Sequence, residues 1–92
     1  MLSLLYVPID TVQNAEQLAA EIIQAKLAVC VNIIPGMTSV YQWQGAVEKS
    51  QELLLLIKVK ANDVAQTKEF LEAHHPYETP CIAEIEFKTV TD

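Results

Sequence analysis

The chain has 92 residues, a hydrophobic fraction of 51% and a formal net charge of −6. This length and hydrophobic content predict one domain over residues 1–92 and exclude an intrinsically disordered chain. All six basic residues are lysines, and so few positive charges argue against nucleic acid and against an anionic membrane surface as partners. No apolar run reaches the length of a transmembrane span.

The first two predicted elements are a strand and a helix. The mostly apolar run Leu2–Ile9 predicts a strand that is central in its sheet and buried on both faces. From Thr11 to Lys26 the pattern is helical, with Asp10 or Thr11 as the N-cap. The apolar residues that recur at helical spacing are Ala15, Leu18, Ala19, Ile22 and Ile23.

The segment from Ala28 to Val59 predicts two long antiparallel strands joined near Gln44-Gly45. Pro35-Gly36 interrupts the first arm, and a proline cannot donate to the hydrogen-bond ladder. We therefore expect an edge strand with a bulge at that point. Because both arms are long, we expect the tip to project beyond the body of the domain.

Side chains on the second arm alternate between two faces. Leu53, Leu55, Ile57 and Val59 share one face, which we expect to lie beneath the helices together with Val29, Val31 and Ile33. The opposite face begins with Leu54 and Leu56 and ends with Lys58 and Lys60. A chain of this size has little left to cover these two leucines, which indicates oligomerisation.

A second helix is predicted from a cap at Asn62 or Asp63 to about His75, followed by a rigid connector over residues 76–80 and a half-exposed strand over residues 81–87. We expect its inner side to consist of Val64, Thr67, Phe70, Leu71 and His74. The element order is that of a ferredoxin-like βαββαβ fold of the α+β class. It has one antiparallel sheet in the strand order 4-1-3-2 and both helices on one face.

His74 and His75 end the second helix and are the first candidates for a metal site. Adjacent helical residues point about 100° apart, so the pair needs a third group from another strand or another chain to hold one ion. The alternative is that they place a cation near the negative end of the helix dipole and begin the connector.

Cys30, on the first hairpin arm, is either a small buried hydrophobe or a soft metal ligand. In the expected strand order, Cys81 lies at the opposite edge of the sheet, so an intrachain disulfide is not expected. The first residues lack the features of a signal peptide, and two free cysteines are typical of a reducing compartment. We therefore expect the protein in the cytoplasm.

No enzymatic signature is present. The chain has no Gly-rich phosphate loop and no nucleophile beside a base. Tyr41 and Trp43 are typical of packing at a subunit contact. The acidic residues read as solvated are Glu48, Glu52, Glu78, Glu84 and Glu86.

Three blocks, AVCVNIIPGMTSVYQWQG, LLLLIK and HHPYETP, occur in an order and spacing that resemble the CutA divalent-cation-tolerance family. The resemblance implies a cytoplasmic, PII-like ferredoxin-like trimer that is linked to copper and other divalent metals and has no required cofactor. It also implies that His74 and His75 are copper ligands, while Cys30 matches the cysteine of the VNIIPG block. A family cysteine on the first strand has no counterpart among residues 4–7.

Family members continue past the fourth strand into a short helix that contains Trp, and this sequence ends at Asp92 without that segment. We therefore expect the surface that such a helix covers to be exposed. Two functions stay open: a trimeric metal-tolerance protein that binds metal weakly, and a PII-like small-ligand sensor or partner scaffold without intrinsic metal.

Overall fold

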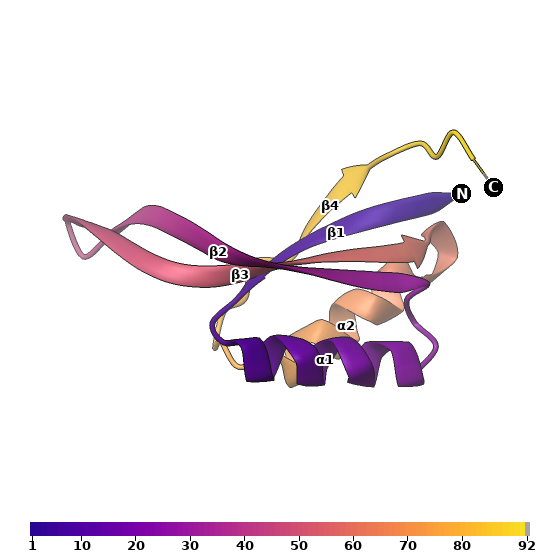
Figure 1. Ribbon diagram of the computed structural model, residues 1–92, viewed down its shortest axis with the longest axis horizontal. Helices are drawn as coiled ribbons and strands as arrows, with labels where there is room; N and C mark the ends of the chain where they lie inside the picture. The colour runs from indigo at the N-terminus through magenta and orange to yellow at the C-terminus, as the bar shows by residue number, and fades with distance from the viewer. Residues whose placement is uncertain (92) are drawn as a thin grey trace.

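The computed structural model describes residues 1–91. The elements in chain order are β1 (Leu2–Ile9), α1 (Val12–Gln24), β2 (Cys30–Trp43), β3 (Ala46–Lys60), the 3-10 turn η1 (Ala61–Asp63), α2 (Val64–His74) and β4 (Ala83–Glu86). The strands form one antiparallel sheet in the order β2-β3-β1-β4. Both helices lie on one face of it (Figure 1). The predicted ferredoxin-like α+β fold and its strand order are confirmed.

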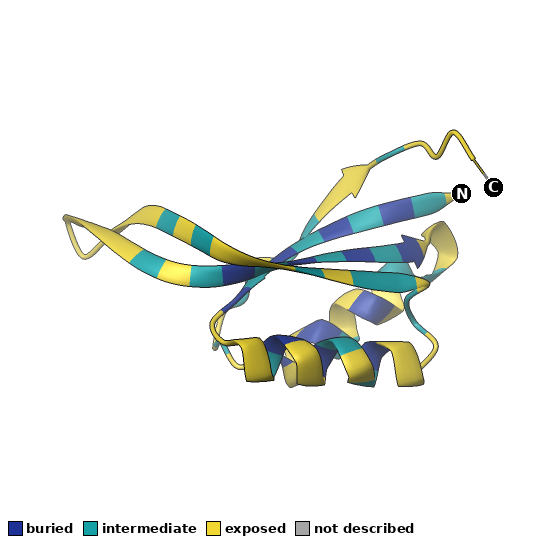
Figure 2. Ribbon diagram, viewed as in Figure 1, coloured by how far each residue is buried: buried dark blue, intermediate teal, exposed yellow. Residues whose placement is uncertain are grey.

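The core lies between the sheet and the two helices, and it follows the predicted alternation. On β3 the buried residues are Leu53, Leu55, Ile57 and Val59, and their neighbours on β1 are Leu5, Val7 and Ile9. These side chains pack with Ala15, Leu18 and Ile22 of α1 and Leu71 of α2. Figure 2 shows the resulting alternation of buried and half-buried positions along β1 and β3.

Val31 and Ile33 pack against this core as predicted, whereas Val29 is 55% exposed. Val29 precedes β2, and its backbone N–H donates to the Lys58 carbonyl while its side chain lies largely in solvent. Two further expectations were also wrong. Ile23 is 41% exposed although it was counted on the inner face of α1. β1 is central, but its second face is only half-buried in the single chain.

Helix α1 has a defined cap at each end. The Thr11 side chain accepts the Asn14 N–H, so Thr11 is the N-cap. At the other end the Lys26 N–H donates to Ile23 and the Leu27 N–H donates to Ile22, which is the double hydrogen bond of a Schellman motif. Lys26 occupies the left-handed position of that motif, with φ 61°, where glycine is usual.

The β2–β3 hairpin turns at Gln44 and Gly45, which have φ 50° and φ 80°. Two consecutive residues with positive φ form a two-residue turn whose twist matches that of the strands. A register shift between Ile34 and Met37 marks the predicted bulge, with Gly36 at φ 76°. The hairpin projects past the helices (Figure 1), and the longest extent of the molecule is 44 Å.

The chain after α2 differs from the prediction in two respects. Helix α2 ends at His74, whose side chain is exposed, and the buried histidine is His75. His75 is extended, with φ −70° and ψ 140°, because the residue before a proline avoids the helical region. Strand β4 has four residues, shorter than the predicted 81–87, because only Ala83–Glu86 pair with β1.

Candidate functional site at the base of the hairpin

The connector that follows α2 is fixed to the sheet by the His75 ring. Its Nε2 lies 2.8 Å from the Pro8 carbonyl oxygen, and its Nδ1 lies 3.0 Å from the Tyr77 backbone nitrogen. A carbonyl can only accept and an amide N–H can only donate, so this geometry fits the neutral ring with its proton on Nε2. Both nitrogens are therefore engaged, and His75 ties the connector to the end of β1.

Tyr77 continues this network toward the hairpin. Its hydroxyl donates to Oε2 of Glu52 at 2.6 Å, and its ring lies edge-on to His75 with centroids 4.6 Å apart. Burial raises the pKa of Tyr77 well above its ordinary value, and the hydrogen bond to Glu52 and the negative charges of Glu52 and Asp10 raise it further. The hydroxyl is therefore a permanent donor at neutral pH.

Asp10, Glu52 and Tyr77 line a polar hollow of about 390 Å³ between the end of β1, the hairpin strands and the connector. A second pair in it is Tyr41 and Ser50, whose hydroxyl oxygens lie 2.6 Å apart. The hollow is lined by Asp10, Tyr41, Ser50, Gln51, Glu52 and Tyr77. Two carboxylates and several hydroxyl groups favour a small polar ligand with hydrogen-bond donors.

The sequence does not predict this hollow, because its residues come from three stretches that are far apart in the chain. Glu52 was expected to be solvated, yet it is half-buried and accepts the Tyr77 hydroxyl. Tyr41 was assigned only to subunit packing. One sequence signal was available, because Glu52 directly precedes the leucine run that enters the core. A carboxylate at that position needs a hydrogen-bond donor, which the connector supplies through Tyr77.

His74 differs from His75 in every respect that matters for metal binding. Its Nδ1 donates to the Phe70 carbonyl at 2.8 Å, and its ring stacks on the Phe70 ring with centroids 4.0 Å apart. That hydrogen bond leaves the lone pair on Nε2, which makes no side-chain hydrogen bond within residues 1–91. A histidine held in this way by a backbone carbonyl is a common arrangement for a metal ligand.

The structure does not bring Cys30 to the two histidines. Cys30 pairs with Lys58 across β2 and β3, so its side chain points to the sheet face opposite the helices, and its Sγ lies 3.9 Å from Oδ1 of Asn32. Cys81 is exposed ahead of β4, at the other edge of the sheet, and both cysteines are free. In residues 1–91 no group of three or more His, Cys, Asp or Glu side chains could hold a metal ion.

Comparison with known families identifies the chain. The family model described as CutA1 divalent ion tolerance protein matches residues 3–92. The chain belongs to the CutA1 family. This agrees with the resemblance of the three sequence blocks, and the family is one of divalent-cation tolerance rather than a known enzyme family.

Among CutA relatives, the divalent-cation tolerance protein CutA of Thermus thermophilus is 46% identical over 77 residues, which are 84% of this chain and 73% of that protein. Protein CutA, chloroplastic, of Arabidopsis thaliana is 41% identical over 75 residues, or 82% of this chain and 41% of that protein. The matched segment thus spans less than half of the plant protein.

The fold of the family is also the fold of this chain. The crystal structure of CutA1 from Oryza sativa superposes with a TM-score of 0.94 at 36% identity, covering 98% of this chain and 83% of the other. In the part of the chain that the structure describes, no helix is both long and apolar enough to cross a membrane.

Proposed function

We propose that this chain is the subunit of a cytoplasmic homotrimer that supports divalent-cation tolerance and binds copper or another divalent ion weakly, without catalysis. In this proposal residues 1–92 act as one CutA-like domain, with neither nucleic acid nor membrane as a partner. The family membership supports the link to divalent cations. The geometry of His74 carries the metal part of the proposal.

His74 is the histidine that suits a metal ion, because its Nε2 is available without loss of a hydrogen bond. An ion on His75 would have to displace either the Pro8 carbonyl or the Tyr77 N–H. Imidazole and thiolate both suit copper, so Cys30 stays in the proposed ligand set, on a different face from His74. One chain supplies too few donors at either place, and a second copy would have to complete the site.

The test is a copper titration of the intact assembly by calorimetry, with His74→Ala, His75→Ala and Cys30→Ser variants beside it. We expect His74→Ala to remove most of the saturable binding. His75→Ala is the matched control, and we expect it to lower stability while copper binding persists. Unchanged affinity and stoichiometry in His74→Ala would remove this residue from the site.

The proposal of an assembly rests on the sheet face opposite the helices. This outer sheet face is apolar over four strands, and its residues are Leu4, Tyr6, Ile34, Leu54, Leu56 and Ile85. The leucines are half-buried, and Ile34 and Ile85 are 43% and 44% exposed. Apolar surface of this kind is usually covered by another chain. Both edges, β2 and β4, are also open to pairing. The number three comes from the resemblance alone.

Analytical ultracentrifugation tests the assembly. Leu56→Asp introduces a charge into the outer sheet face, and we expect it to shift the protein toward the mass of one chain. Ala20→Asp makes the same change in charge at an exposed position of α1, and we expect it to leave the mass unchanged. A monomeric mass for the unmodified protein at micromolar concentration would end the proposal.

The second function, a PII-like sensor or a partner scaffold without intrinsic metal, is favoured by the polar hollow at the base of the hairpin. If no saturable copper binding is found, this function takes precedence. A small polar ligand of the hollow would raise the melting temperature of the protein, and Tyr77→Phe, which removes one hydroxyl, would reduce that shift.

A further inference from the structure

A histidine and a carboxylate line the same small hollow, which lies between the two helices. Its volume is about 80 Å³, which is room for an ion with a few waters and far below the roughly 300–1,000 Å³ of small-molecule sites. Helix α1 forms one wall with residues spaced three or four apart, and the end of α2 forms the other. The lining residues are Asn14, Gln17, Leu18, Glu21, His74 and Pro76. We call this space the interhelical hollow.

The His74 ring is prepared for a ligand on one of its nitrogens. Its Nδ1 donates to the Phe70 carbonyl, and its ring stacks on the Phe70 ring. In this tautomer the lone pair is on Nε2. His74 is exposed, so an ion can reach Nε2 from solvent without moving the helices.

Glu21 is half-buried in the wall opposite His74, and no cation neutralises it. The one ion pair in residues 1–91 joins Lys68 and Glu72 on α2, so neither a lysine nor His74 lies within ion-pair distance of Glu21. A partly buried carboxylate without a partner is unfavourable. An ion with bonds of about 2.0–2.2 Å to nitrogen and oxygen can join two groups that do not touch, and it would also neutralise Glu21.

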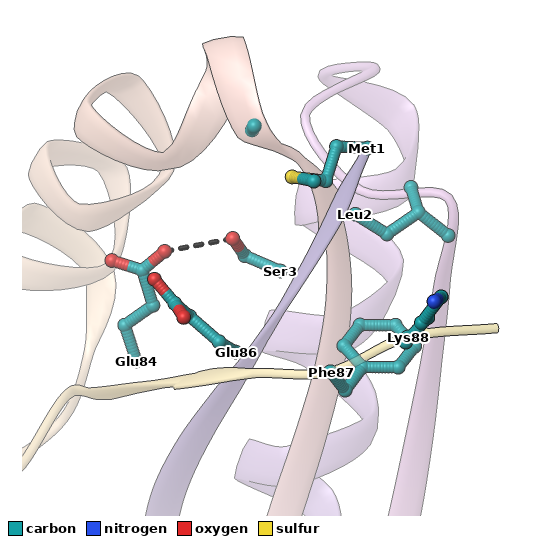
Figure 3. Close-up of a pocket in the computed structure, with 8 residues that line it drawn as sticks. Met1, Leu2, Ser3, Glu84, Glu86, Phe87 and Lys88 are labelled. Carbon is teal, nitrogen blue, oxygen red and sulfur yellow. Dashed lines mark hydrogen bonds between the residues drawn. The ribbon is translucent and has the colours of Figure 1, made fainter.

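The hollow beside β4 lacks this combination of groups. Glu84 and Glu86 lie on the helix-side face of β4, and the Ser3 hydroxyl donates to Glu84 at 2.7 Å (Figure 3). Leu2 and Phe87 lie on the opposite face of the sheet. Among the described residues that line it there is neither histidine nor cysteine, and carboxylates alone do not select a transition metal.

We propose that Glu21 is the second protein ligand of the ion that His74 binds, and that the interhelical hollow takes Cu(II) or Zn(II) rather than Cu(I). This inference rests on the metal part of the proposed function. Imidazole and carboxylate together suit these divalent ions, whereas Cu(I) prefers thiolate and thioether ligands, and Cys30 lies on the other face of the sheet. Two protein ligands are fewer than a tight site has. Binding is therefore weak, and the remaining positions are left to water and to the second copy.

The test is calorimetric titration of the intact assembly with Cu(II), with Glu21→Gln beside the unmodified protein. We expect Glu21→Gln to weaken binding by at least about tenfold, since loss of even an outer-shell partner costs about 10–100-fold. Glu16→Gln is the matched control, because it removes the same charge from an exposed position of α1, and it should leave the affinity unchanged. Anaerobic titration with Cu(I) should not distinguish Glu21→Gln from the unmodified protein.

Thermal melts separate a metal ligand from a structural carboxylate. With a chelator present, Glu21→Gln should melt no lower than the unmodified protein, because it removes a charge that has no partner. Cu(II) should raise the melting temperature of the unmodified protein, and the rise should be smaller in Glu21→Gln. A lower melting temperature of Glu21→Gln in chelator, with an unchanged rise on adding Cu(II), would assign Glu21 a structural role instead.

The His74→Ala variant distinguishes failure of this inference from failure of the proposed function. If His74→Ala loses copper binding while Glu21→Gln and Glu16→Gln bind equally well, the inference is overturned and the proposed function stands. Unchanged binding in His74→Ala, or no saturable binding by the unmodified protein, would overturn both. A Cu(I) affinity that depends on Glu21 would overturn the assignment of the divalent state.

Discussion

The leucine run of β3 offers a direct test of the faces assigned to the sheet. Leu55 is fully buried and lies between Val7 and Ile33, while Leu56 lies on the outer sheet face between Tyr6 and Asn32. Replacing a buried leucine with alanine costs about 2–5 kcal/mol. A domain of this length has a free energy of unfolding of roughly 5–14 kcal/mol, at about 0.05–0.15 kcal/mol per residue. Leu55→Ala should therefore remove a large part of it.

Leu56→Ala should cost less than Leu55→Ala in the dilute protein, because part of the Leu56 side chain is in water in the single chain. Its cost should grow with protein concentration, since the lost contact is the one made with other copies. The assay is urea denaturation followed by circular dichroism at several concentrations, with sedimentation of the same samples. Equal losses for the two variants, with unchanged sedimentation of Leu56→Ala, would refute the assigned faces.

Two further predictions concern single side chains. The pKa of Tyr77 is raised in the folded state, so above about pH 10 the folded protein keeps a proton that the unfolded chain releases. The contribution of the Tyr77 hydroxyl to the free energy of unfolding is therefore complete below about pH 10 and is lost as the pH rises further. Tyr77→Phe should therefore flatten the fall in stability above about pH 10 in urea titrations, and an unchanged slope would contradict this cause. Lys26→Gly should raise the free energy of unfolding by about 1 kcal/mol by relieving the left-handed conformation. Ala25→Gly, at a right-handed position, should lower the free energy of unfolding. Thermal melts of both variants are the assay, and a lower free energy of unfolding in both would refute the Schellman assignment.

The sheet could be predicted because its signals are local. Alternation along Leu53–Val59 sets the buried face, and the Pro35-Gly36 and Gln44-Gly45 pairs locate the bulge and the turn. The two histidines could not be assigned correctly for a physical reason. Which of them is buried depends on a hydrogen bond from His75 to Pro8, 67 residues earlier in the chain. Helical spacing alone carries no information about that contact.

For the polar hollow, the position of Glu52 before the leucine run is a local signal, but the partner of its carboxylate cannot be predicted, for the same reason. The Tyr77 hydroxyl meets Glu52 across 25 residues of sequence, and the bond exists only after β1, β3 and the connector have come together. Val29 shows that a local pattern can also predict burial where none occurs. Its position continues the alternation of the hairpin arm, but the ladder begins one residue later at Cys30, and the pattern cannot indicate where pairing starts.

The strand order has a consequence for the way the chain folds. The β2–β3 hairpin is local in sequence, and hairpins of this kind form within microseconds. Of the four strands, β1 is synthesised first and its neighbour β4 is synthesised last. The hydrogen bond between Ser3 and Glu84, which are 81 residues apart, can therefore form only late. Contacts of such long range slow folding. During synthesis, we expect the hairpin to form first and the β1–β4 edge to close only after β4 has left the ribosome.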